Sequence, residues 1–312
     1  MPRDGSINLP QGAVPAAPMD IGEIANPPFA ILPDPARIFQ KRAERFAKLA
    51  PGHQLQPYLE FLAALSRAQH DVQATLAVPG LPPPERLLTA REHTMPPISF
   101  TQVELDAVAD ATFKGIADRL ADTGLTDAAK AAIDKVRSAS AADRAAMMRA
   151  VLMDDVPETA IAEHVLAAAA VQVHFSRLAA RLDVATLSPV ADGACPACGS
   201  PPVASAVVGR EGMHGSRFCT CSICATEWHV VRVKCLACGS EKGISYQSIE
   251  GGSQVLLGET CESCHSYVKI LHQHKDGGLD PVADDVASLA LDLVLGKDGW
   301  VRASANPFLL GY

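Results

Sequence analysis

Apolar residues recur at helical spacing through the first half of the chain. Asp34-Pro35 is typical of a helix start, because Asp caps a helix and Pro fits its first turn. A second periodic run follows the Pro51-Gly52 break. The two runs predict amphipathic helices that pack against each other. Their apolar positions are Ile38, Phe39, Phe46 and Leu49, then Tyr58, Phe61, Leu62, Leu65 and Val72.

The helical pattern continues to about residue 182. We interpret the Pro-punctuated segment 79–97 mainly as loop, and we predict helices from near Thr101 to Leu120 and over 126–138, 141–153 and 157–182. The last of these is alanine-rich and apolar on most sides, which is typical of a helix at the centre of a bundle. Residues 1–30 are rich in Pro and Gly without any period, which predicts a disordered tail.

The pattern changes at residues 188–193. Short runs rich in β-branched and aromatic residues follow at 203–208, 227–233, 244–249 and 267–271, and they predict small antiparallel hairpins. Asp280-Pro281 then begins one more helix, which Gly296 ends. The predicted division is a tail (1–30), a helical domain (31–187), a module of hairpins (188–279), and a helix with a C-terminal tail (280–312).

All nine cysteines lie in the hairpin module, and eight of them form four C-x-x-C pairs. The whole pattern repeats after 40 positions, and Ala197-Cys198-Gly199-Ser200 returns as Ala237-Cys238-Gly239-Ser240, which indicates a tandem duplication. A C-x-x-C turn places both sulfurs on one side of a tight loop, and a following glycine can take a positive φ. The pairs are Cys195/Cys198, Cys221/Cys224, Cys235/Cys238 and Cys261/Cys264.

Two such turns together give a closed tetrahedral four-sulfur site. Consecutive pairing joins the first turn with the second and the third with the fourth, whereas cross-brace pairing joins the first with the third. The duplication favours consecutive pairing. We therefore predict two metal ions, and four thiolates accept iron or zinc alike. The fold class is α+β, with a mainly helical N-terminal domain and a C-terminal module of two rubredoxin-like or zinc-ribbon-like β-hairpin metal sites.

Cys219 has no C-x-x-C partner. We interpret it as a small buried residue in preference to a spare reactive thiolate.

Composition and charge narrow the function classes. The net charge is −8, which argues against nucleic acid as a partner, because phosphate contacts require a basic surface. The N-terminus has no apolar stretch of signal-peptide length, and no window of ~18 apolar residues follows, so we expect no membrane span and a cytoplasmic protein. In a reducing compartment, paired cysteines are metal ligands more often than disulfides.

Several segments resemble one known family. CPACGSPPVAS, FCTCSICATEWHVVRVKC, ETCESCHSYVKILHQ, PVADDVASLALDLVL and NPFLL, together with ILPDPARIFQKRAERFAKLA and YLEFLAALSRAQHD, are similar to the formate dehydrogenase accessory (formation) proteins. The resemblance covers about residues 30–310. It implies an assembly factor, not an enzyme, that is required for active respiratory formate dehydrogenase and binds its molybdenum-containing catalytic subunit. It also implies that the eight paired cysteines are the metal ligands.

Two other functions stay open at this stage. A rubredoxin-like electron carrier would hold iron in its four-sulfur sites. A nucleic-acid-binding zinc ribbon is disfavoured by local charge, because residues 195–275 hold seven Lys/Arg and six Asp/Glu, and two metal–thiolate centres each add −2. The oligomeric state is also open, and a homo-oligomer is one alternative.

Overall fold

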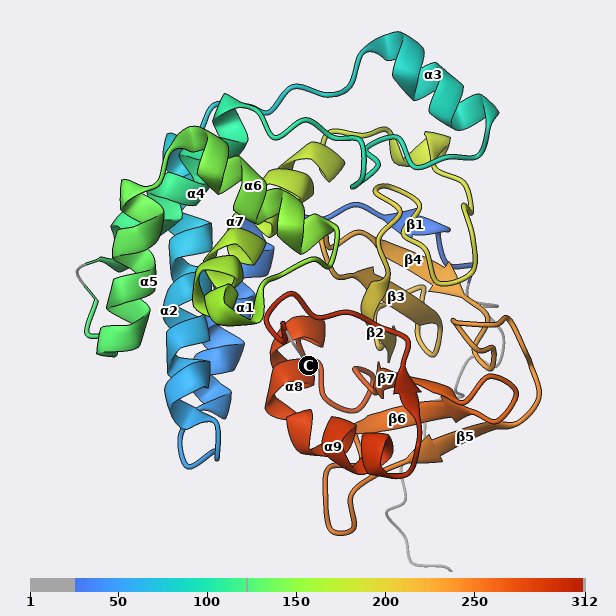
Figure 1. The fold of residues 1–312 in the computed structure, drawn as a ribbon. Helices are drawn as coiled ribbons and strands as arrows, with labels where there is room; N and C mark the ends of the chain where they lie inside the picture. Colours follow the sequence, from blue (N-terminus) through green and yellow to red (C-terminus); the bar gives the residue numbers. More distant parts are fainter. Residues whose placement is uncertain (1–25, 122, 311–312) are drawn as a thin grey trace, which may run out of the picture.

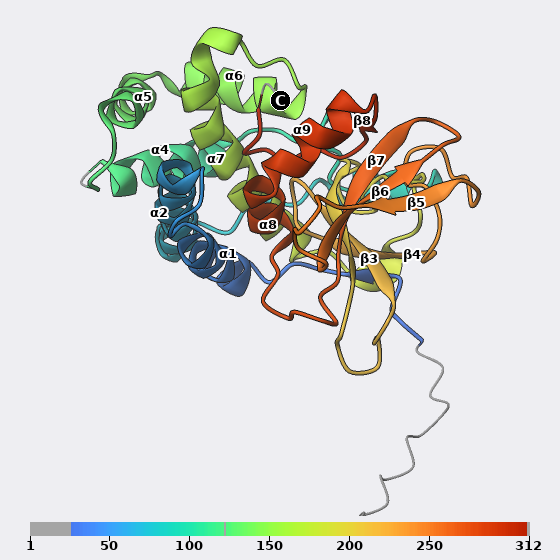
Figure 2. The same ribbon diagram turned by 90° about the horizontal axis from the view of Figure 1, so that it is seen from below.

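A computed structural model describes residues 26–121 and 123–310 of the chain. A bundle of helices occupies one side, a β-sheet the other, and two C-terminal helices lie between them (Figures 1 and 2). This arrangement confirms the predicted α+β fold class. No helix within the described ranges is long and apolar enough to cross a membrane.

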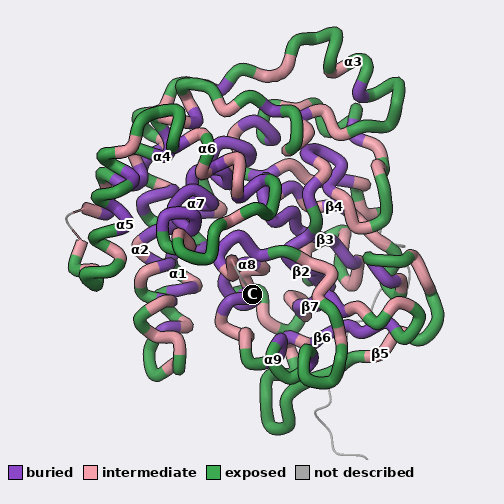
Figure 3. Tube along the Cα trace, in the orientation of Figure 1, coloured by how far each residue is buried: buried purple, intermediate pink, exposed green. Residues whose placement is uncertain are grey.

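The bundle is built around one central helix. Six helices form it: α1 (Pro35–Leu49), α2 (Gln56–Val72), α4 (Ala107–Leu120), α5 (Asp127–Ser138), α6 (Ala141–Leu152) and α7 (Ile161–Ala179). Nearly all of α7 is buried (Figure 3), as its apolar circumference predicts. Buried polar side chains link the helices of the bundle: Arg42 on α1 donates to Gln172 Oε1 on α7 at 3.1 Å, and Gln69 on α2 donates to the Ala169 carbonyl at 2.9 Å.

Two helical predictions in the first half of the chain need correction. The segment 79–97, interpreted mainly as loop, contains α3 (Pro84–Glu92), which projects from the bundle (Figure 1). Ala90 is its one buried residue, so this helix has no apolar stripe that a periodicity could reveal. The fourth helix, α4, begins at Ala107 and not near Thr101, because the Asp106 carboxylate accepts the N–H groups of Val108 and Ala109 and so caps the helix there.

The strands of the metal module and two short strands from outside it, β1 (Ala30–Ile31) and β8 (Val301–Arg302), form one continuous sheet. The strands of the module are β2 (Pro202–Val207), β3 (Arg217–Cys221), β4 (Glu227–Val230), β5 (Ile244–Gln247), β6 (Leu256–Cys261) and β7 (Ser266–Leu271). The order is β1-β4-β3-β2-β7-β6-β5, and β8 pairs with β7. Small antiparallel hairpins were predicted, and the parallel pair β2–β7, with Ser205 opposite Ile270, joins the two cysteine units into one sheet.

Four strands were not predicted from the sequence: the two-residue strands β1 and β8, and the longer strands β3 and β6. The strands β3 (RFCTC) and β6 (LLGETC) mix polar, small and cysteine residues, so neither shows a clean β signal, yet both are almost fully buried. Residues 1–25 of the predicted disordered tail (1–30) lie outside the described residues. The last residue of this tail, Ala30, pairs with Trp228 in the sheet.

The predicted C-terminal helix is two helices, α8 (Pro281–Ala287) and α9 (Leu289–Lys297). The chain bends at Ser288, whose carbonyl oxygen accepts a hydrogen bond from Lys269 Nζ at 3.2 Å and whose hydroxyl oxygen accepts another at 2.9 Å. A tertiary contact therefore ends α8, and the sequence around Ser288 contains no Pro or Gly to show it.

Candidate metal centres

The structure gathers the eight paired cysteines into two groups of four thiols. In each group all four sulfurs lie within 4.8 Å of one another. The grouping follows consecutive pairing, with the first C-x-x-C turn facing the second and the third facing the fourth. The groups are Cys195, Cys198, Cys221 and Cys224 (site 1), and Cys235, Cys238, Cys261 and Cys264 (site 2).

The sulfur spacing fits a tetrahedral metal ion. A metal–sulfur distance of ~2.3 Å places tetrahedral sulfurs about 3.8 Å apart. In site 1 the Sγ–Sγ distances are 3.6 Å for Cys195–Cys224 and 3.4 Å for Cys198–Cys221. In site 2 they are 3.6 Å for Cys235–Cys264 and 3.8 Å for Cys238–Cys261. These distances are far longer than a disulfide bond, and all of these cysteines are free thiols.

The two sites are copies in their backbone hydrogen bonds. Gly199 N–H donates to the Cys195 carbonyl at 2.8 Å, and Gly239 N–H donates to the Cys235 carbonyl at 3.0 Å. Thiols also receive backbone N–H groups, as Cys221 Sγ does from Cys224 at 3.3 Å. Such N–H groups stabilise the charge of a metal-bound thiolate. This repetition agrees with a duplicated unit.

All four turns place the residue after the second cysteine in the left-handed region. Glycine occupies this position in the first turn of each site, at φ +85° for Gly199 and +73° for Gly239. In the second turns the residues are Ala225, at φ +60°, and His265, at φ +52°. A side chain in this conformation costs free energy that glycine does not.

We expect Ala225→Gly to raise the free energy of unfolding of the metal-loaded protein by about 0.5–1 kcal/mol, because glycine adopts this φ without strain. Ala197→Gly is the matched control, since Ala197 lies inside the first turn without a positive φ and is fully buried. The control should lower stability by a similar or larger amount. Urea unfolding followed by circular dichroism measures both, and equal losses in the two variants would contradict the prediction.

The two sites differ sharply in exposure. Every thiol of site 1 is buried, with none above 1% exposed. In site 2, Cys235 and Cys261 are buried, but Cys238 is exposed and Cys264 is partly exposed. The two sites therefore have the same four-cysteine ligand set but differ in how far their thiols are exposed to solvent.

The helical bundle covers site 1. The loop after α3 lies along the first turn, where Ile98 N–H donates to the Ala197 carbonyl at 3.0 Å and Phe100 N–H donates to the Cys198 carbonyl at 2.9 Å. From the central helix, Gln172 Nε2 donates to the Ser222 carbonyl at 2.9 Å. Ser200 Oγ lies 3.0 Å from Cys221 Sγ and 3.1 Å from Cys198 Sγ. The cysteine spacing identifies all eight thiols but gives no sign of these covering groups.

We expect a strong chelator to remove the two metal ions in two phases. Site 2 should lose its ion at least about tenfold faster than site 1, because a chelator reaches the exposed Cys238 without opening the bundle. Release of the metal can be followed by the absorbance of a metal-sensitive dye, and each phase should account for one ion. A Cys238→Ser variant should lack the fast phase, and a single phase in the wild-type protein would contradict this assignment.

Cys219 belongs to neither site. It is fully buried in β3, opposite Ser205 on β2 and Trp228 on β4. Burial raises the pKa of its thiol to about 12; the nearby Arg217 cation lowers this pKa and the Glu259 carboxylate raises it, both by less than burial does. The thiol is therefore protonated at neutral pH, in agreement with a packing role.

A buried ion pair connects the two units near this cysteine. Arg217 on β3 donates to Glu259 Oε1 on β6 at 2.8 Å, and both side chains are almost completely buried. The same guanidinium donates to the carbonyl oxygens of Arg232 and Lys234, at 3.2 and 3.1 Å. Since Lys234 directly precedes Cys235, Arg217 fixes the segment that joins site 1 to site 2.

The fold and its two sites define a class of protein. A helical bundle is joined to a duplicated four-cysteine module, and both quartets fit a metal ion in a closed, all-thiolate arrangement.

Comparison with known proteins identifies the family. The FdhE models match residues 27–192 (N-terminal), 194–232 (central domain) and 233–309 (C-terminal domain). The chain is 43% identical over 297 residues to the FdhE homolog of Rhizobium meliloti, covering 95% of this chain and 97% of that protein. It is 37% identical to the FdhE homolog of Pseudomonas aeruginosa, covering 89% and 92%. The chain belongs to the FdhE family, the formate dehydrogenase formation proteins.

A solved structure agrees with this assignment. The crystal structure of the FdhE protein from Pseudomonas aeruginosa matches with a TM-score of 0.79 at 34% sequence identity, over 91% of this chain and 99% of that chain. The resemblance stated from the sequence is thereby confirmed.

Proposed function

We propose that this chain is a cytoplasmic, non-enzymatic assembly factor that binds the catalytic subunit of formate dehydrogenase and holds one iron or zinc ion in each cysteine quartet. The family relationship, which extends over both quartets and the helical bundle, is the observation that carries the proposal. In this proposal residues 31–187 are the scaffold and residues 188–279 the metal module.

The donor sets support a structural or electron-transferring role for the metal more than a hydrolytic one. Four cysteine sulfurs fill every position of a tetrahedral ion, whereas a catalytic zinc keeps one position open for water. The thiols hold the ion, and the N–H groups of the turns and Ser200 stabilise the thiolate charge. Burial acts to raise the pKa of Cys264, but hydrogen bonds from Ser266, Cys238 and Cys235 together outweigh it, so the pKa falls to about 7, which favours the thiolate that a metal requires.

One observation favours a second candidate function. Site 2 reaches the surface at Cys238, as an electron-transfer site must, so a rubredoxin-like electron carrier is the alternative. An iron-loaded protein with a reversible visible absorption would support this role. A zinc-only protein would exclude it.

The test is an anaerobic affinity purification of the tagged protein from formate-respiring cells, with mass spectrometry of the proteins that accompany it. We expect the formate dehydrogenase catalytic subunit at high yield. A Cys235→Ala, Cys238→Ala variant, with its helical content checked by circular dichroism, separates the contribution of site 2. Absence of the catalytic subunit from the wild-type sample would refute the proposed function.

A further inference from the structure

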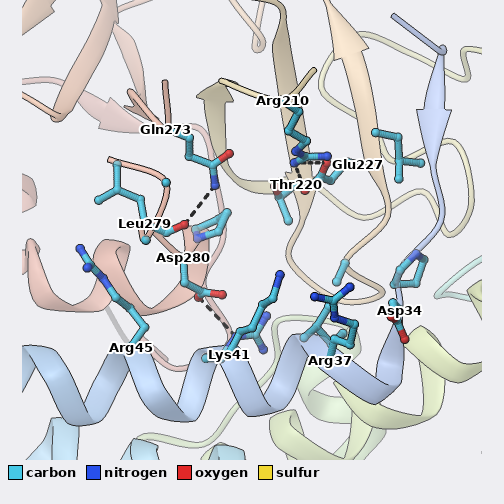
Figure 4. A pocket seen from close by; sticks show the side chains of 18 of the residues that line it. Asp34, Arg37, Lys41, Arg45, Arg210, Thr220, Glu227, Gln273, Leu279 and Asp280 are labelled. Atoms are coloured by element: carbon cyan, nitrogen blue, oxygen red, sulfur yellow. Dashed lines mark hydrogen bonds and ion pairs between the residues drawn. The ribbon is translucent and has the colours of Figure 1, made fainter. Parts of the chain in front are cut away.

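A cleft lined by charged and apolar side chains lies between the bundle and the sheet, and Thr220 and Ala225, the chain neighbours of the site 1 thiols Cys221 and Cys224, form part of its lining. Its volume is about 820 Å³. One wall is helix α1, and the opposite wall comprises the segments near β1, the hairpin before β3 and the loop 273–281 (Figure 4). The cleft therefore depends on the docked arrangement of bundle and sheet.

Cations from α1 line this cleft. Arg37, Lys41, Arg45 and Lys48 repeat at intervals of four, four and three residues, which places them along one face of the helix. In Figure 4 the side chains of Arg37 and Lys41 rise from α1 toward the opposite wall. From Arg37 to Lys48 the helix rises roughly 16 Å, at ~1.5 Å per residue.

Most acidic groups around the cleft are already engaged. Arg45 pairs with Asp284 at 2.6 Å, Arg210 with Glu227 at 2.6 Å, and Arg42 with Asp280 at 3.5 Å. Asp34 caps α1 by accepting the Ala36 N–H.

Three cations remain without a carboxylate partner. Arg37, Lys41 and Lys48 are exposed and form no ion pair with any residue in 26–121 or 123–310. Arg37 also lies in the first turn of α1, where the helix dipole disfavours a cation and where the structure shows no acidic residue. A chain of net charge −8 thus keeps a locally positive cleft.

The remaining lining distinguishes between anionic ligands. Partly buried apolar side chains, among them Ile31, Leu32 and Ile38, alternate with the charged groups. The free cations are spread in a line and do not converge on one point, as they would around a single phosphate. Asp34, Glu44, Glu227 and Asp280 also line the cleft, so a ligand whose negative charges are spaced along its length fits it better than one that concentrates them at one point. An extended peptide of about five residues has the length of the cation row, at ~3.3 Å per residue.

We propose that this cleft binds an extended acidic segment of a partner protein, with its carboxylates on Arg37, Lys41 and Lys48 and its apolar side chains against Ile31 and Ile38. The inference rests on the proposed function in one respect, because it takes the client of the assembly factor as the source of the segment. Electrostatic complementarity of this kind sets specificity and the rate of association.

The first experiment uses the full-length, metal-loaded protein and a fluorescein-labelled hexaglutamate peptide, with fluorescence anisotropy as the readout. The wild-type protein should bind the peptide saturably, and added salt should weaken binding. An Arg37→Gln, Lys41→Gln, Lys48→Gln variant should bind about tenfold more weakly, because the small binding free energies of three exposed ion pairs are lost together. The matched control is Arg67→Gln, Arg91→Gln, Lys114→Gln, which removes the same charge from exposed sites outside the cleft and should keep wild-type affinity.

Two results would overturn the proposal. One is equal affinity of the two triple variants for hexaglutamate, or no binding by the wild-type protein. The other is tighter binding of a labelled six-residue oligothymidylate through the same three cations, which would make the cleft a phosphodiester site.

Affinity purification from cells then identifies the source of the segment. The cleft variant should retain less formate dehydrogenase catalytic subunit than the control variant. Equal retention would exclude the client as the ligand of the cleft. If the wild-type protein retains no catalytic subunit, the proposed function fails, while the peptide measurement still decides whether the cleft binds acidic segments.

Discussion

A Cys198→Ser substitution should remove the metal ion of site 1 and unfold the sheet. The metal contributes on the order of 10 kcal/mol to the folding of such a site, which is comparable to the whole stability of a typical domain. Cys198 is fully buried, and its carbonyl also accepts the Phe100 N–H from the loop that docks the bundle. Loss of the ion therefore leaves buried thiols beneath the bundle and loosens the contact between the two halves of the fold.

The matched control is Cys238→Ser, the same chemical change at the corresponding position of site 2. Cys238 is exposed, so loss of that ion should disturb the local turns and leave the bundle and site 1 intact. Metal content by elemental analysis should fall by one ion in each variant. Thermal unfolding should show a large loss of stability for Cys198→Ser and a small one for Cys238→Ser. Similar unfolding curves for the two variants would show that the burial of a site does not determine how much its metal ion stabilises the protein.

A Lys269→Met substitution should lower the free energy of unfolding by about 3–5 kcal/mol, because it leaves buried carboxylates without their ammonium partner. Lys269 Nζ lies 3.1 Å from Asp285 Oδ1 and 2.5 Å from Asp292 Oδ2, and all three side chains are buried. Arg302 also pairs with both carboxylates, so part of the compensation survives. The network joins β7 to α8, α9 and the C-terminal segment.

Lys297→Met is the control for this variant, since Lys297 ends α9 at the surface and forms no ion pair within the described residues. Its stability should stay within ~0.5 kcal/mol of the wild-type protein. Chemical denaturation of both variants, with metal content held equal, measures the difference. A loss below 1 kcal/mol for Lys269→Met would mean that Arg302 alone neutralises the pair.

The sequence by itself determined the bundle and the identity of the eight gathered thiols. Helical periodicity located α1, α2 and α7 because each has an apolar face, or an apolar circumference, that local spacing expresses. The C-x-x-C turns and the 40-residue repeat identified the quartets, since a four-sulfur site requires two such turns of fixed geometry. Where that local signal was weak, as in α3, β3 and β6, the elements were missed.

Only the tertiary structure decided what surrounds those thiols. Two quartets with the same spacing differ in exposure because the loop at Ile98–Phe100 and the side chain of Gln172 cover just one of them. The Asp284-Asp285 pair shows the same dependence, as Asp284 pairs with Arg45 on α1 and Asp285 with Lys269 on β7. The basic cleft likewise exists only where α1 faces the sheet. Spacing along the chain encodes local geometry, but burial and charge pairing arise between segments far apart in sequence, and their energies depend on which surfaces meet.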